Sequence, residues 1–274
     1  TSGADNIVMV WETLSWQVLH TLTGHGQDRT SVPPIRGIFA LAFSPLCNDT
    51  SGPCPLAGAG LDGQLIIWDA LSGIPLITYW DPEAGLMSTA FSPDGTRLAV
   101  GNAIPGGGNS WATILDATTG QTLRTLQAAP GWVWGVGFDP DGRRLATLNF
   151  LGDGKVWNIE DGQELVDLKG VQNGGYSITY SPDGKLLAAG SNGSVVILDA
   201  HTGLPLFSLP GHYSLVVRSS FSPDGRYLAT ASLDGTVRVY VVPSDDLLIL
   251  AHSRLTRSLR PEECQKYLHQ EMCP

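Results

Sequence analysis

Histidine, cysteine and recurrent aspartate residues are the side chains with which catalysis or metal binding in this chain would begin. No His-x-x-x-His pair, Gly-x-Ser-x-Gly turn, haem-attachment motif or zinc-ligand spacing occurs, so neither a nucleophilic site nor a metal site is indicated. The acidic residues Asp94, Asp141, Asp183 and Asp224 recur at turns, where forming the turn is their first role. The sequence therefore predicts a protein that is not an enzyme and has no cofactor. The six histidines are His20, His25, His201, His212, His252 and His269.

The four cysteines form two local pairs, Cys47 with Cys54 and Cys264 with Cys273. Cys47 and Cys54 flank a Pro/Gly/Ser loop, and a disulfide that closes such a loop stabilises a fold by about 2 to 3 kcal/mol. Metal binding usually shows shorter spacing and further His or Cys ligands. We therefore predict two disulfides and an oxidising compartment, with free thiols as the alternative. Asn48 begins an Asn-Asp-Thr triplet in the same loop and is a candidate glycosylation site.

These residues are carried by a repeat. The stretch from Phe221 to Tyr240 reads as an apolar run closed by Ser-Pro-Asp-Gly, a short second run, a Leu-Asp-Gly turn and an alternating third run. Asp-Gly supplies the left-handed backbone of a tight hairpin, so three strands joined by two hairpins are expected. Equivalent aromatic residues stand at positions 43, 91, 138, 180 and 221, with spacings of 48, 47, 42 and 41. A period near forty with four short strands per unit is typical of a β-propeller.

The repeat resembles the WD-repeat family of β-propellers. The Trp-Asp pair of that family stands at Trp68-Asp69, and its Gly-His pair stands at Gly24-His25 and Gly211-His212. In that family a His, a Ser or Thr, a turn Asp and the Trp form a buried hydrogen-bonded set. The resemblance implies one such set at His212, Ser232 and Asp234, with Tyr240 in place of Trp. It implies another at His25, Asp62 and Trp68, with Gly60 or Ala59 at the Ser/Thr position.

The predicted fold is all-β: a β-propeller of four-stranded antiparallel blades, with about six blade-like units, followed by a short helical C-terminal tail. The expected domains are residues 1–243 for the propeller and 244–274 for the tail packed on it. Residues 1–22 and 214–242 predict incomplete terminal units, with four complete repeats between them. Either upstream repeats are missing, or the ring closes with an incomplete blade, or the exposed edges pair with another molecule.

The tail changes composition after Pro243. Ser244 precedes two acidic residues and an apolar run, which predicts a helix, and Pro261 with two following Glu predicts a second helix. The segments 257–259 and 262–268 resemble a tail found after WD repeats in large bacterial multidomain proteins. That resemblance implies a bacterial source.

The loops that enter the innermost strands are the expected contact surface. Aromatic residues at a rim bury much area with little loss of rotamer entropy, so they commonly anchor proteins or carbohydrates. Packing between neighbouring blades is the competing explanation for each of them. The predicted partner-binding rim residues are Phe39, Met87, Trp132, Trp134, Tyr176 and Tyr213.

Composition narrows the function classes. The formal net charge of -10 argues against nucleic acid, and no apolar run reaches the roughly 18 residues that a membrane span needs. We therefore expect a non-catalytic scaffold that binds other proteins. A subunit of an extracellular bacterial filament, joined to copies of itself through edge strands, is one alternative. A carbohydrate-binding or hydrolytic propeller is another, so glycan binding stays open. The expected location is secreted or at the cell surface, with the cytoplasm as the alternative.

Overall fold

The computed structural model describes residues 1–26, 37–48, 52–104, 108–172 and 174–242. The predicted helical tail, with Cys264 and Cys273, lies outside these residues, and so do Asp49 and Thr50 of the Asn48 triplet. Within the described residues, no helix has the length and apolar character that a bilayer crossing requires.

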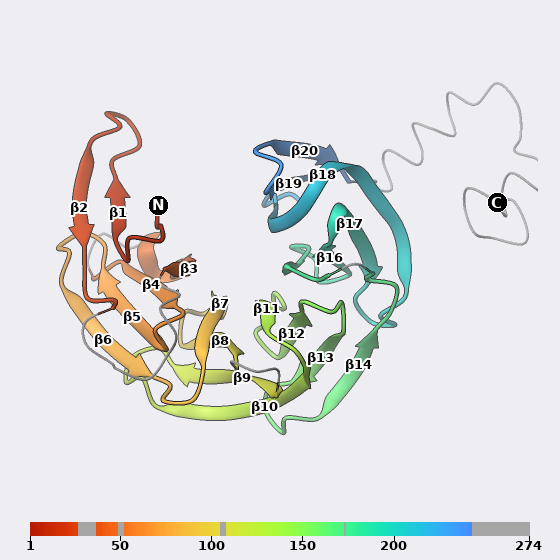
Figure 1. The fold of residues 1–274 in the computed structure, drawn as a ribbon, viewed down its shortest axis with the longest axis horizontal. Helices are drawn as coiled ribbons and strands as arrows, with labels where there is room; N and C mark the ends of the chain where they lie inside the picture. The colour runs from red at the N-terminus through yellow and green to blue at the C-terminus, as the bar shows by residue number, and fades with distance from the viewer. Residues whose placement is uncertain (27–36, 49–51, 105–107, 173, 243–274) are drawn as a thin grey trace, which may run out of the picture. The chain divides into compact units, whose positions relative to one another are not determined.

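The described residues fold as antiparallel sheets, which confirms the predicted all-β class with four-stranded units. Figure 1 shows the strands of a unit ordered from an inner first strand to an outer fourth strand, as in β7 to β10. The first unit is a pair of strands, β1 (Val8–Trp11) and β2 (Val18–Leu22). The second unit consists of β3 (Ile38–Phe43), β4 (Pro55–Gly60), β5 (Gln64–Asp69) and β6 (Pro75–Trp80). The third consists of β7 (Gly85–Phe91), β8 (Arg97–Ala103), β9 (Asn109–Asp116) and β10 (Thr122–Pro130). The fourth consists of β11 (Val133–Phe138), β12 (Arg144–Asn149), β13 (Gly154–Asn158) and β14 (Glu164–Leu168).

The last two units share one long strand. β15 (Ser177–Tyr180), β16 (Leu186–Gly190) and β17 (Asn192–Asp199) are followed by β18 (Pro205–Phe221), whose first half pairs with β17. The second half of β18 pairs with β19 (Tyr227–Ser232), which is followed by β20 (Val237–Val241). The outer strand of one unit thus continues without a turn as the inner strand of the next.

Turn chemistry fixes the hairpins, as the sequence predicts. At the turn between β18 and β19, Ser222 Oγ donates to Asp224 Oδ1 at 2.5 Å, and Asp224 Oδ1 accepts the N–H of Arg226 at 3.1 Å. Gly225 has φ 72°, a left-handed conformation that glycine adopts without steric cost. This hairpin therefore begins at a locally encoded position, and its strand register follows from the turn.

The core consists of apolar clusters between successive sheets. One cluster joins Ala57 and Leu65 to Leu98 and Leu115, so the sheets of β4 and of β8 pack face to face. Similar clusters join the first two units and the units that follow. Trp68, with 1% of its surface exposed, is one of the largest fully buried side chains. Burial between units, rather than within one sheet, holds consecutive sheets together.

The chain divides into two compact units, Thr1–Tyr240 and Val241–Pro274. The second unit is described only at Val241, which ends β20, and at Val242, which is buried. The domain boundary after residue 243 stays a prediction.

The terminal units have fewer strands than the units between them. Thr1 and Met9 exchange two backbone hydrogen bonds at 2.8 Å, so the first residues pair beside β1 as the end of a second strand. β20 ends the strand order of its sheet, so among the described residues no strand covers its outer edge.

Candidate functional site

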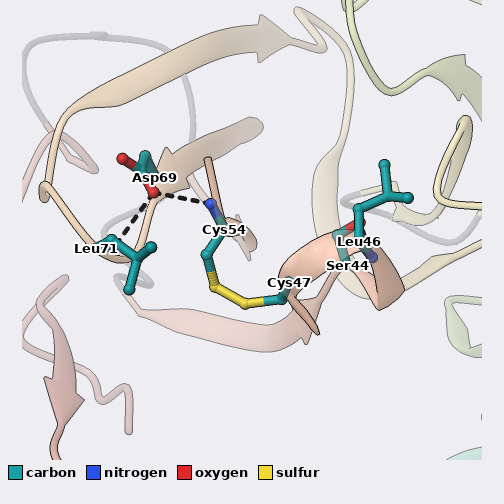
Figure 2. Close-up of a disulfide and its surroundings, with 6 residues drawn as sticks. All are labelled: Ser44, Leu46, Cys47, Cys54, Asp69 and Leu71. Carbon is teal, nitrogen blue, oxygen red and sulfur yellow. Dashed lines mark hydrogen bonds between the residues drawn. A yellow bond between two sulfur atoms is a disulfide. The ribbon is translucent and has the colours of Figure 1, made fainter. Parts of the chain in front are cut away.

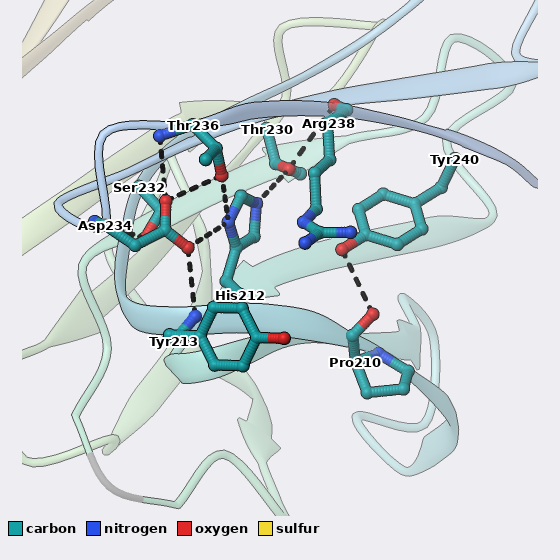
Figure 3. A network of polar contacts seen from close by, with 9 residues as sticks. All are labelled: Pro210, His212, Tyr213, Thr230, Ser232, Asp234, Thr236, Arg238 and Tyr240. Atoms are coloured by element: carbon teal, nitrogen blue, oxygen red, sulfur yellow. Dashed lines mark hydrogen bonds and ion pairs between the residues drawn. The ribbon is translucent and has the colours of Figure 1, made fainter.

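The predicted hydrogen-bonded set around His212 is shown in Figure 3. His212 Nδ1 lies 2.9 Å from Asp234 Oδ2, and His212 Nε2 lies 2.8 Å from Thr230 Oγ1. Asp234 also accepts the N–H of Tyr213 at 2.9 Å and the hydroxyl of Thr236 at 2.6 Å. The hydrogen bond from Thr236, followed by that from the Tyr213 N–H, lowers the pKa of Asp234. The carboxylate therefore ties the middle of the long strand β18 to the turn after β19.

One member of this set differs from the prediction. The hydroxyl that meets the His212 ring belongs to Thr230, whereas Ser232 Oγ accepts the N–H of Asp234 at 3.2 Å. Both side chains point to the same face of β19, because residues two apart in a strand share a face. Thr230 Oγ1 also lies 3.4 Å from the carbonyl oxygen of Arg238. Tyr240 bonds instead to the carbonyl of Pro210 at 3.2 Å.

The set around His25 lacks its hydroxyl. His25 Nδ1 lies 3.1 Å from both carboxylate oxygens of Asp62, and the His25 ring is tilted against Trp68 with centroids 5.7 Å apart. Burial alone would raise the pKa of Asp62, but hydrogen bonds and the charge of His25 lower it. His25 Nε2 is buried and has no partner among the described residues.

Strand register explains the missing partner. Gly58 pairs with the residue two positions before Trp68, and Thr147 pairs with the residue two positions before Trp157. Thr147 Oγ1 accepts the indole N–H of Trp157 at 2.9 Å, so this is the Ser/Thr position. The predicted places, Gly60 or Ala59, are therefore corrected to Gly58. A Cβ at Gly58 would lie 2.8 Å from the Trp68 ring, so the indole occupies the space that a hydroxyl side chain needs.

The functional candidate is an aromatic group that we call the channel-mouth cluster. Trp134 lies at its centre, with its ring centroid 5.1 Å from that of Tyr176, 6.4 Å from that of Phe39 and 6.3 Å from that of Trp132. Phe150 lies 6.3 Å from Trp132. Phe39 and Phe150 are each 38% exposed. The cluster consists of Phe39, Trp132, Trp134, Phe150 and Tyr176.

Inner strands of different units position these rings. Phe39 lies on β3, Trp134 lies on β11, and Tyr176 immediately precedes β15. The Trp132 indole N–H donates to the carbonyl of Ile104 at 3.0 Å, which fixes that ring to the preceding sheet. The repeat brings equivalent positions to one end of the inner strands, as the sequence predicts for Phe39, Trp134 and Tyr176.

Two of the predicted rim residues lie elsewhere. Met87 is 1% exposed and packs with Leu61 and Ala103 beneath Trp132 and Trp134, so it supports the cluster and offers no contact surface. Tyr213 is 89% exposed, and no ring contact joins it to the cluster in the described part of the chain. Sequence analysis missed Phe150, because it follows an inner hairpin and does not occupy the repeated position.

A channel of about 310 Å³ begins at Trp134 and runs between the inner strands β3, β7, β11, β15 and β18. Its walls carry the hydroxyl side chains Ser88, Thr89, Ser177, Thr179 and Ser219 and the guanidinium group of Arg218. Arg218 Nη2 donates to the carbonyl of Phe39, so residues 179 positions apart meet here. Arg218 carries no sequence motif that would have identified it.

The predicted disulfide loop lies away from the cluster. Figure 2 shows Cys47, in a short 3-10 helix (Pro45–Asn48), bonded to Cys54 immediately before β4. The N–H of Cys54 donates to Asp69 Oδ1 at 2.9 Å, which anchors the loop to the end of β5. Asn48 ends the 3-10 helix, and its glycosylation stays a prediction.

The described residues contain no group of three or more His, Cys, Asp or Glu side chains placed to hold a metal ion. The arrangement that they do contain is an aromatic surface above a polar channel.

Comparison with known proteins identifies the repeat. Residues 120–158, 169–199 and 203–240 match the family described as WD domain, G-beta repeat. The chain is 30% identical over 252 residues to WD repeat-containing protein SL1-17 of Schistosoma mansoni, covering 91% of this chain and 63% of that protein. It is 43% identical over 65 residues to the target of rapamycin complex subunit wat1 of Schizosaccharomyces pombe, covering 23% of this chain and 21% of that protein.

The chain is also 45% identical over 94 residues to cilia- and flagella-associated protein 251 of Pongo abelii. This match covers 32% of this chain and 8% of that protein. The chain thus spans less than two thirds of the length of each of these relatives. Three segments between residues 120 and 240 thus match the WD40 repeat, and the four-stranded antiparallel sheets of the described residues are consistent with blades of that repeat.

Proposed function

We propose that this chain is a non-catalytic interaction module that binds a partner protein at the channel-mouth cluster. The observation that carries the proposal is that five aromatic side chains from three different repeats meet at one end of the inner strands. Two of them, Phe39 and Phe150, keep 38% of their surface exposed. Rigid rings that remain partly exposed supply contact area at low entropic cost.

The family supports this choice. WD-repeat proteins generally act as scaffolds for protein interactions and are usually non-catalytic. The relative from Schizosaccharomyces pombe is named as a subunit of a complex. Fold alone does not assign a partner, so the site has to carry the assignment.

Partner capture by two matched variants tests the proposal. Phe39→Ser removes an exposed apolar side chain of the cluster, and Leu123→Ser removes one that is 51% exposed on the outer strand β10. With the full chain as bait in an extract of cells that express it, we expect Phe39→Ser to weaken capture of the bound protein about tenfold. Leu123→Ser should capture it like the wild type. Equal capture by both variants would contradict the proposal.

A second candidate, assembly of the chain with copies of itself, is favoured by a specific observation. Val237 and Val239 on the edge strand β20 are 71% and 65% exposed, and Tyr227 on the adjacent strand is 47% exposed. An uncovered strand edge beside apolar side chains is a surface that pairs with another strand. The filament version of the function rests on this sheet.

We further propose a secreted or cell-surface location, with a cytoplasmic location as the alternative, and keep a bacterial source as an expectation. The disulfide between Cys47 and Cys54 supports the first location, because such bonds persist in oxidising compartments.

Glycan binding is the third possible function, since aromatic faces also bind sugars. The described residues that line the 310 Å³ channel include no Asp or Glu, so we propose for this version that it binds a glycan without hydrolysing it.

A further inference from the structure

We propose that the channel below the channel-mouth cluster receives a carboxylate group of the partner protein, which pairs with Arg218. This inference rests on the proposed function and adds the chemistry that the partner must present. It follows from the donors in the channel, from the lack of a carboxylate among the described residues of its walls and from its size.

Arg218 supplies the charge. Its Nη1 donates to the carbonyl of Val217 at 2.8 Å and its Nη2 donates to that of Phe39. A guanidinium has five N–H donors, so these two bonds leave others. None of the ion pairs found among the described residues includes Arg218. Protein atoms crowd the group and lower its pKa, yet arginine remains charged in proteins and its side chain still reaches solvent.

Two further polar groups of the channel are unpaired. The indole Nε1 of Trp134 and Oγ1 of Thr89 are both buried and have no hydrogen-bond partner in the described part of the chain. Both residues line the same channel as Arg218. An indole N–H can only donate, so it requires an acceptor. Ser177 Oγ and Ser219 Oγ lie 3.2 Å apart on the wall and share a hydrogen bond, which leaves one hydroxyl hydrogen available.

The electrostatics favour an anion over a cation. Among the described residues that line the channel there is no Asp or Glu, whereas the chain as a whole has 26 acidic and 16 basic residues. Arg218 therefore favours a negatively charged group of the partner over a positively charged one. A Lys or Arg of the partner would be repelled by Arg218, with no carboxylate nearby to offset the repulsion. Carboxylates accept charge-assisted hydrogen bonds from arginine, which are stronger than neutral ones.

Size limits what enters. A volume of about 310 Å³ lies at the lower end of the range for ligand pockets, so it suits one side chain or a chain end and not a folded element. The carboxylate can thus come from an Asp or Glu side chain or from a C-terminus. In either case the residues beside it would contact the exposed rings of Phe39 and Phe150.

Nuclear magnetic resonance of the full chain tests the inference with three small probes. N-acetylglutamate α-amide carries a side-chain carboxylate, N-acetylalanine carries a terminal carboxylate, and N-acetylglutamine α-amide is the neutral match. The reporter is the indole N–H signal of Trp134, assigned by its loss in Trp134→Phe. We expect at least one carboxylate to shift this signal saturably at millimolar concentration, and the neutral amide to leave it unchanged. The probe that saturates identifies the source of the carboxylate.

Substitutions of Arg218 test whether its positive charge binds the probe. Arg218→Gln should weaken probe binding about tenfold, and Arg218→Lys, which keeps the charge, should retain part of it. Lys185→Gln removes one positive charge at an exposed turn and should bind like the wild type. Equal shifts by acid and amide, no shift by either acid, or undiminished binding to Arg218→Gln would each overturn the inference.

The partner measurement separates the two proposals. If Phe39→Ser weakens partner capture and Arg218→Gln leaves it unchanged, the carboxylate inference fails and the proposed function stands. If neither variant weakens capture, the proposed function fails, and the inference fails as a statement about the partner even where the small probes bind.

Discussion

At the residue scale, the two histidine sets show how one position changes a network. His212 has partners on both ring nitrogens, Asp234 and Thr230, whereas His25 has Asp62 on one nitrogen and a buried Nε2 on the other. Gly58 stands where Thr230 stands in the last unit. The indole of Trp68 fills that space and contacts the His25 ring. Packing against Trp68 thus replaces a hydrogen bond.

Thr230→Val tests the value of the complete network. The substitution keeps the shape of the side chain, removes the hydroxyl 2.8 Å from His212 Nε2 and leaves a buried nitrogen without a partner. We expect the free energy of unfolding to fall by about 1 to 3 kcal/mol in urea titrations. Thr125→Val, at an exposed position of the outer strand β10, is the matched control and should change it by less than about 0.5 kcal/mol. A cost for Thr230→Val no greater than that of the control would show that the ring needs no second partner.

Asp234 makes stability depend on pH. Its pKa is lowered in the folded protein, first by the Thr236 hydroxyl and then by the Tyr213 N–H and His212. A group with a lowered folded pKa stabilises the fold above its unfolded pKa, about 3.9, and loses that contribution as pH falls further. Between about pH 6 and pH 2, the free energy of unfolding of Asp234→Asn should therefore fall less steeply than that of the wild type. If the free energies of unfolding of the two proteins fell in parallel with pH, other carboxylates would account for the loss of stability in acid.

At the element scale, the Cys47–Cys54 disulfide replaces the short turn that the other units have between their first two strands. The bond closes a loop with a sequence separation of 7, and Asp69 holds its end through the N–H of Cys54. The N–H of Ala70 also donates to the carbonyl of Cys54 at 2.8 Å. The loop is therefore held by the disulfide and by hydrogen bonds at its ends, whereas the turns of Ser-Pro-Asp-Gly type depend on their own side chains and backbone.

Removing this bond should destabilise the fold. For the double variant Cys47→Ser and Cys54→Ser we expect a loss of about 2 to 3 kcal/mol on the chain-entropy account, measured by thermal unfolding. Adding a reductant should lower the unfolding temperature of the wild type more than that of this variant. The residual effect in the variant measures any contribution of Cys264 and Cys273. An identical response of both proteins to reductant would mean that this bond contributes nothing.

At the scale of the whole molecule, function depends on neighbours that the repeat brings together. The sequence predicts the strands, turns and unit number because they are encoded locally, by Ser-Pro-Asp-Gly turns and alternating runs. It also finds Phe39, Trp134 and Tyr176, because they occupy one repeated position. It does not find Arg218 beside Phe39, since that contact joins positions 179 apart. It indicates Ser232 and not Thr230 as the hydroxyl partner of His212, because both side chains lie on the same face of β19.

Assembly is a whole-molecule question with its own test. If the filament version holds, the wild type should sediment as larger species with rising concentration, and Val237→Lys with Val239→Lys should remain monomeric. Both side chains are mostly exposed, so each substitution should change stability by less than about 0.5 kcal/mol. A wild type that stays monomeric at every concentration would rule out assembly through β20. The interaction module would then remain as the proposed function.

The most direct test of the central claim is site-specific photo-cross-linking in the cells that make the protein. Benzoylphenylalanine replaces Phe39 in the channel-mouth cluster or Leu123 on the outer strand β10, both of which are partly exposed. We expect one discrete cross-linked partner from position 39 and none of that mass from position 123. The same partner cross-linked from position 123 but not from position 39 would contradict it, because the binding surface would then lie on the outer strands.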